Sequence, residues 1–126
     1  MAKYGICAKT AAETARDGID PLTAWRQAAR AIFPHSPSFQ IKGCPRDAFL
    51  GLCEDGLVKG IPRGSYTKSR LNKSYALQAI GLLRSEPDLA KDDLWHGVQG
   101  YSGQAHNGKM DVVLTLWRSG LLEIVQ

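Results

Sequence analysis

Apolar residues recur every three or four positions along most of the chain, which is the spacing of one face of an α-helix. This pattern predicts helices that begin near Tyr4, Pro21, Pro45 and Leu71, then a short helix around Trp95 and a last one over residues 109–119. Roughly 60% of the residues fall in such stretches, and few show the alternation typical of strands. The sequence therefore predicts an all-α fold of five or six helices with little or no strand.

Several helix ends are marked by local signals. Asp20 followed by Pro21 places a side-chain acceptor at a helix start and proline where no amide donor is missed. Gly56 followed by Leu57 is typical of a helix end closed by a glycine and an apolar contact. Residues 34–43 and 58–70 are short of apolar positions and are expected to be loops, the second with a brief hairpin at most.

Two segments of the chain resemble each other. Residues 47–58 and 111–122 share Asp, Leu, Leu, Gly and Leu at identical offsets, and a tryptophan and a tyrosine precede each segment in the same order. We interpret this as two similar three-helix halves, about 4–61 and 75–125, with Trp25 and Trp95 as equivalent core residues. The alternative is that unrelated amphipathic helices ending in glycine look alike.

Length and composition indicate one domain over residues 1–126. No apolar stretch approaches the ~20 residues that span a bilayer, and the first residues lack the apolar run of a signal peptide. The three cysteines, an odd number, favour a reducing compartment. We therefore expect a cytoplasmic protein that does not bind membranes.

The charges are unevenly distributed along the sequence. Residues 21–85 carry ten cations and three acids, whereas residues 86–126 carry three cations and six acids. Such a separation favours an anionic partner if folding keeps the cations on one surface.

The basic linker 59–73 is the strongest candidate for a binding segment because it contains five cations, several glycines and hydroxyls, and no acid. The candidate phosphate-binding residues are Lys59, Arg63, Lys68, Arg70 and Lys73, with Lys42 and Arg46 (and also Arg26 and Arg30) extending the surface. We hypothesise a small non-enzymatic module that contacts nucleic-acid phosphates, for which five contacts predict a salt slope of about −4.5 on duplex DNA. The alternatives are an interaction domain for an acidic protein, or a solvated loop whose charges only aid solubility.

Cys44 supports a hypothesis from another class. It lies at a predicted helix N-terminus between Lys42 and Arg46, where the dipole and the cations favour the thiolate. With His106 as a candidate base, the chain would be a thiol-dependent enzyme or a redox-responsive protein. The alternative is a structural cysteine. The sequence shows no other catalytic residue, no cofactor motif, and no zinc-ligand spacing among Cys7, Cys53 and the histidines.

Two resemblances accompany these patterns. Residues 47–61 resemble the end of a recognition helix running into the wing of a winged-helix protein. More widely, residues 42–61, 72–76 and 106–113 resemble an uncharacterised bacterial family, a domain of unknown function. This second resemblance implies a bacterial cytoplasmic origin, and it implies no activity or ligand.

Overall fold

The computed structural model describes residues 2–99 and 108–123. Within these residues the chain forms six helices of at least nine residues and one single-turn helix. Their bounds are α1 Lys3–Ala15, α2 Pro21–Ile32, α3 Pro37–Gln40, α4 Gly43–Glu54, α5 Arg70–Ser85, α6 Lys91–Gln99 and α7 Lys109–Arg118. Helices make up 66% of the described residues, which confirms the predicted all-α fold.

The local signals act at the helix ends as expected. Asp20 accepts a hydrogen bond from the Thr23 backbone at the start of α2. At the end of α4, Gly56 has a φ of 71°, and the Leu57 amide donates to the Leu52 carbonyl at 3.1 Å. The predicted loop at 34–43 contains one element that the pattern does not predict, the single turn α3, which Ser36 caps by accepting from the Phe39 amide.

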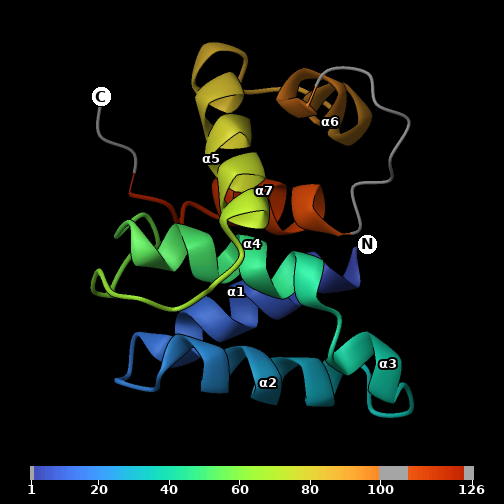
Figure 1. The fold of residues 1–126 in the computed structure, drawn as a ribbon, viewed down its shortest axis with the longest axis vertical. Coiled ribbons are helices and arrows are strands. Elements are labelled where there is room, and N and C mark those ends of the chain that lie inside the picture. The colour runs from blue at the N-terminus through green and yellow to red at the C-terminus, as the bar shows by residue number, and fades with distance from the viewer. Residues whose placement is uncertain (1, 100–107, 124–126) are drawn as a thin grey trace.

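The central helices α4 and α7 pack against each other and run in the same direction (Figure 1). The pair α1 and α2 lies on one side of them, and the pair α5 and α6 lies on the other (Figure 1). One helix of each outer pair also packs on a central helix: α1 packs on α7, and α5 packs on α4. Leu52 and Leu116, which occupy corresponding positions of the central helices, are fully buried.

The segments that follow the central helices also meet. Val58 and Leu122 form an isolated antiparallel bridge, in which the Lys59 amide donates to Leu121 and the Glu123 amide donates to Leu57. Val58, the first residue of the segment predicted as a loop with a brief hairpin at most, therefore pairs with the far end of the chain. These paired contacts support the interpretation of two related halves, which stays a prediction.

Candidate anion-binding pocket

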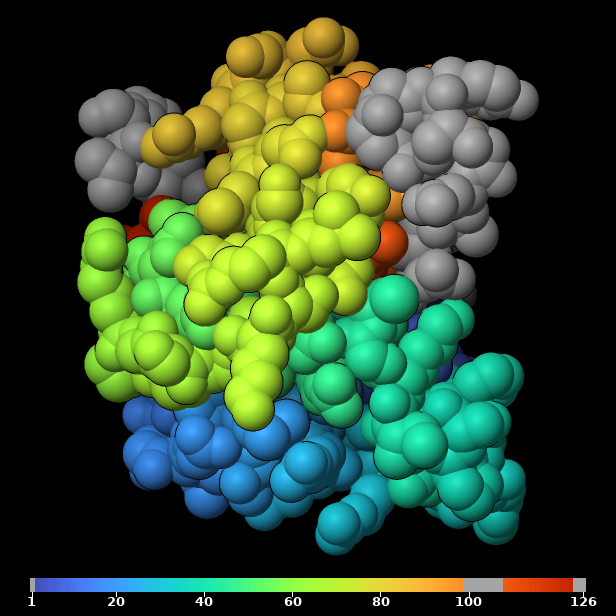
Figure 2. Space-filling model, in the orientation of Figure 1, coloured from blue at the N-terminus to red at the C-terminus, as the bar shows by residue number. Residues whose placement is uncertain are grey.

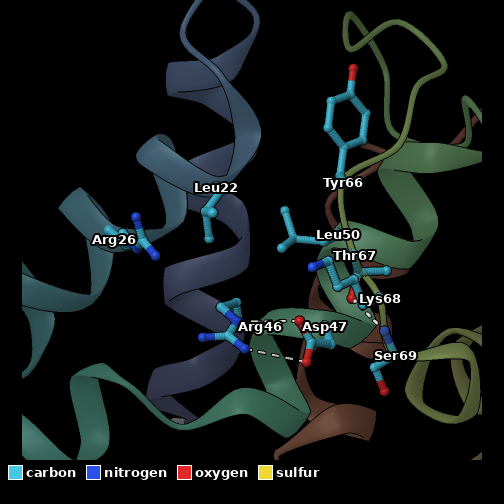
Figure 3. A pocket seen from close by; sticks show the side chains of 9 residues that line it. All are labelled: Leu22, Arg26, Arg46, Asp47, Leu50, Tyr66, Thr67, Lys68 and Ser69. Atoms are coloured by element: carbon cyan, nitrogen blue, oxygen red, sulfur yellow. Dashed lines mark hydrogen bonds and ion pairs between the residues drawn. The ribbon is translucent and has the colours of Figure 1, made fainter.

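A pocket of about 530 Å³ opens between α2, α4 and the basic linker 59–73. Figure 3 shows Leu22 and Arg26 projecting from α2, Arg46, Asp47 and Leu50 from α4, and residues 66–69 from the linker. In the space-filling view the yellow-green linker borders the blue surface of α2 (Figure 2). Segments that are distant in the sequence thus meet in one place.

Three cations line this pocket. Arg26 and Lys68 are exposed, and Arg46 is partly buried. Asp47 is the one acid among the described residues that line it, and its carboxylate already accepts from Arg46 at 3.2 and 3.4 Å (Figure 3). Arg26 and Lys68 therefore keep their charge available to an anion in the pocket.

The wall formed by the linker is polar. The Ser69 hydroxyl caps α5 by accepting from the Asn72 amide, and the Thr67 hydroxyl accepts from the Ser69 amide. Each hydroxyl keeps its own hydrogen for donation. The tyrosine ring of Tyr66 points away from the guanidinium groups (Figure 3), and its hydroxyl donates to the Pro62 carbonyl. Tyr66 consequently borders the pocket with its backbone, and its ring lies away from the guanidinium groups (Figure 3).

Glu54 fixes the linker in this position. Its side chain, only 4% exposed, accepts from the backbone amides of Tyr66 and Thr67 at 2.8 and 2.9 Å and pairs with Lys73 at 3.0 Å and Arg70 at 3.4 Å. Burial raises the pKa of this carboxyl, but the hydrogen bonds from Thr67, Lys73 and Tyr66 outweigh burial and lower the pKa to about 2. The linker is therefore pinned to the end of α4.

The candidate residues named from the sequence separate into groups. Lys68 and Arg46 line the pocket, together with Arg26. Lys73 is neutralised by Glu54 and Asp55, whereas Arg70 pairs with Glu54 but keeps a side chain that is 73% exposed. The others lie outside the pocket lining: Lys42 over the ring of Tyr4, Arg63 beside Gly56, and Lys59 exposed. Phosphate binding by these residues stays a prediction.

Sequence reasoning misses several residues of the pocket. The apolar periodicity marks Leu22 and Leu50 only as residues of buried helix faces, yet both contribute apolar lining to the pocket. Glu54 counts in the sequence only as one of the few acids of a basic region, although an acid directly before a basic linker is a signal for such an internal tether.

The three cysteines differ in burial, and none of them lines the pocket. Cys7 and Cys53 are buried, and burial raises the pKa of both thiols, that of Cys7 to about 11. Cys44 is half-buried at the start of α4. His106, its candidate base, lies outside the described residues, so the pairing stays a hypothesis.

A buried cation lies near Cys44. Lys109, 4% exposed, places its ammonium 4.6 Å from the ring centre of Tyr75 and 4.7 Å from that of Trp95. Burial lowers the pKa of Lys109, and the Cys44 thiol partly opposes that shift. Because its charge faces two rings in the interior, Lys109 is unlike the exposed cations of the pocket.

No described helix combines the length and apolar character needed to cross a membrane. In the described part of the chain, no three His, Cys, Asp or Glu side chains gather as metal ligands.

Fold and pocket together define an all-α protein with a basic pocket on one face. The chain belongs to DUF6979, a family of unknown function, whose profile matches residues 1–123. The expected resemblance to an uncharacterised family is thereby confirmed, whereas the bacterial origin and the winged-helix resemblance stay predictions. Neither a curated protein nor a solved structure matches the chain.

Proposed function

We propose that this protein is a non-enzymatic binding module that contacts the phosphates of nucleic acid. The observation that carries the proposal is the convergence of Arg26, Arg46 and Lys68, from three separate segments, on one pocket. Long basic side chains beside hydroxyl groups are the usual protein partners of phosphate oxygens. The single acid of the described lining is paired with Arg46 and does not neutralise the other two cations.

Ion pairs within the protein reduce the expected dependence of the DNA-binding constant on salt concentration. Five phosphate contacts from the linker alone would give a slope of about −4.5, but Lys73 is already paired with two acids. Arg46 is likewise paired with Asp47, so the two remaining cations of the pocket lining, Arg26 and Lys68, give a slope of about −1.8 on duplex DNA. We expect the measured slope to lie nearer the smaller value.

Fluorescence anisotropy with a labelled DNA duplex, repeated across a series of salt concentrations, tests the proposal. Lys68→Ala should weaken binding about tenfold, the effect of losing one charge-assisted contact. Lys9→Ala removes an equally exposed lysine from α1, outside the pocket lining, and should change affinity less than about twofold. Absence of binding at low salt both to this duplex and to its separated strands, or equal effects of the two variants, would overturn the proposal.

A further inference from the structure

A second hollow borders the pocket at Arg26 of α2. This hollow, of about 160 Å³, is lined by Arg26, Arg30, Gln40 and Ile41. Arg26 lines both hollows, so the two are adjacent, with Lys68 in the lining of the larger one and Ile41 in that of the smaller. We call this surface the α2 strip: the larger pocket and the smaller hollow joined at Arg26.

The lining of the α2 strip is more than a row of charges. Leu22, which is partly exposed, gives the larger pocket an apolar side with the buried Leu50 behind it, and Ile41, 74% exposed, gives the smaller hollow another. A phosphate gains nothing from leucine or isoleucine, because burying apolar surface favours only an apolar or aromatic group. The strip therefore fits a ligand that alternates anionic groups with flat, weakly polar ones.

The volume of the larger pocket also suits a ligand with a flat, weakly polar group. Sites for small organic ligands typically enclose ~300–1,000 Å³, and about 530 Å³ lies inside that range. A nucleobase enters such a pocket only when it is unstacked and turned outward, which is the normal state of single strands and is costly in a duplex. The planar guanidinium of Arg26, between the two hollows, can stack on a base or bind a phosphate.

We propose that the α2 strip binds single-stranded nucleic acid, with one unstacked base in the larger pocket and the backbone passing Arg26 toward Arg30 and Ile41. This inference rests on the proposed function and narrows it from nucleic acid in general to single strands. Charge complementarity favours this occupant, because Asp47 is the one acid in the described lining of either hollow.

Three probes distinguish the possible ligands: a short fluorescein-labelled DNA strand of mixed sequence, the duplex formed with its complement, and a labelled nucleoside monophosphate. We expect the strand to bind at least about tenfold more tightly than the duplex at the same salt concentration. It should also bind at least about tenfold more tightly than the monophosphate, which fills only the larger pocket.

Two variants divide the strip at Arg26. Lys68→Ala changes only the lining of the larger pocket, and Arg30→Ala changes only that of the smaller hollow. Both should weaken binding of the strand several-fold, whereas only Lys68→Ala should weaken binding of the monophosphate. Lys9→Ala is the charge-matched control and should leave both affinities unchanged within about twofold.

The possible failures can be told apart. A duplex that binds as tightly as the strand overturns the single-strand inference and leaves phosphate binding intact. A monophosphate that binds as tightly as the strand, or an Arg30→Ala variant with unchanged strand affinity, shows that the smaller hollow contributes nothing and also overturns the inference. Absence of binding to every nucleic acid at low salt overturns the proposed function itself.

Discussion

Single side chains decide how the basic linker is held. Four donors converge on the Glu54 carboxylate, two from the backbone and two from cationic side chains. Loss of the carboxylate would leave these four donors, two of them backbone amides, without their acceptor, which is costly for groups that are partly buried. Replacement of this residue therefore affects the linker as a whole.

Glu54→Gln should destabilise the protein by about 3 kcal/mol at neutral pH, the usual effect of breaking a buried ion pair. The free energy of unfolding from urea titration checks this. The folded-state pKa of about 2 lies below the ordinary value of 4.5, so the stabilisation is present above pH 4.5 and is lost as the pH falls toward 2. The difference in unfolding free energy between wild type and Glu54→Gln should therefore narrow between pH 4.5 and pH 2. A constant difference would contradict the lowered pKa of Glu54.

Lys109 is the opposite case, a cation whose burial lowers its pKa. Because the folded state favours the neutral amine, stability should increase as the pH rises from the lowered pKa toward 10.5. Lys109→Met keeps the length of the side chain and removes the charge, so it should raise stability at pH 7 by on the order of 1 kcal/mol.

Thermal denaturation of this variant beside Lys91→Met provides the comparison. Lys91 is 42% exposed and pairs with Asp111, so its replacement should have little effect. A lower melting temperature for Lys109→Met would mean that the contacts with Tyr75 and Trp95 outweigh the cost of burying the charge.

At the level of helices, the close crossings depend on glycine. A Cβ atom at Gly5 of α1 would lie 2.9 Å from the Asp111 carbonyl oxygen of α7 and would overlap Thr115. At the other crossing, a Cβ atom at Gly51 of α4 would lie 2.9 Å from the Cα of Lys73 in α5. Residues 51 and 115 occupy corresponding positions in the two similar segments, so the same site of each central helix receives a crossing helix.

Gly5→Ala should destabilise the protein by about 1–3 kcal/mol, because the backbone of α7 cannot move aside without disturbing the core. Gly81→Ala is the matched control: this glycine is exposed in α5, and a methyl group added there would have nothing within 4 Å. It should stabilise by about 0.5–1 kcal/mol through helix propensity alone. Urea unfolding of both variants measures the two effects, and shifts of the same sign would contradict this account of the crossing.

The sequence predicted the helices well because their ends are set by neighbouring residues. Asp20 and Pro21 start α2, and Gly56 with Leu57 closes α4, all through contacts within a few positions. The turn α3 was missed because its cap, Ser36, stands in a stretch rich in proline and serine that also fits a loop. Residues 58–70 were predicted as a loop with a brief hairpin at most, and the pairing of Val58 with Leu122 was not predicted because it joins distant positions.

The pocket was predictable only in part. Residues 21–46 and 59–73 were each recognisable as basic, but the meeting of Arg26, Arg46 and Lys68 depends on how α2 packs beside α4. Likewise, the capture of Lys73 by Glu54 joins positions 19 residues apart, which no local pattern reports. Periodicity shows which face of a helix is buried, but it does not show which polar faces become neighbours.

Across the whole molecule, the helices before residue 70 and those after it pack on each other. The main partner of α1 outside its own pair is α7, and α4 packs most closely on α5, so a cut between residues 69 and 70 separates both contacts. We expect the fragments 1–69 and 70–126 to be poorly helical alone and to regain cooperative unfolding when mixed in equal amounts. Far-ultraviolet circular dichroism during heating checks this, and a cooperative transition in either fragment alone would contradict it.

The two ends of the molecule differ in charge. The cationic residues of α2 lie at one end of the long axis, and the connection between α5 and α6 lies at the other (Figure 1). That connection forms a hollow of about 430 Å³ lined by Glu86, Asp88 and Asp93. Exposed cations of α2 and the acids of this connection are thus separated along the long axis (Figure 1). The proposed strand is a polyanion that would be attracted by the cations of α2 and repelled by these acids, so we expect added salt to slow capture of the strand more than it speeds release.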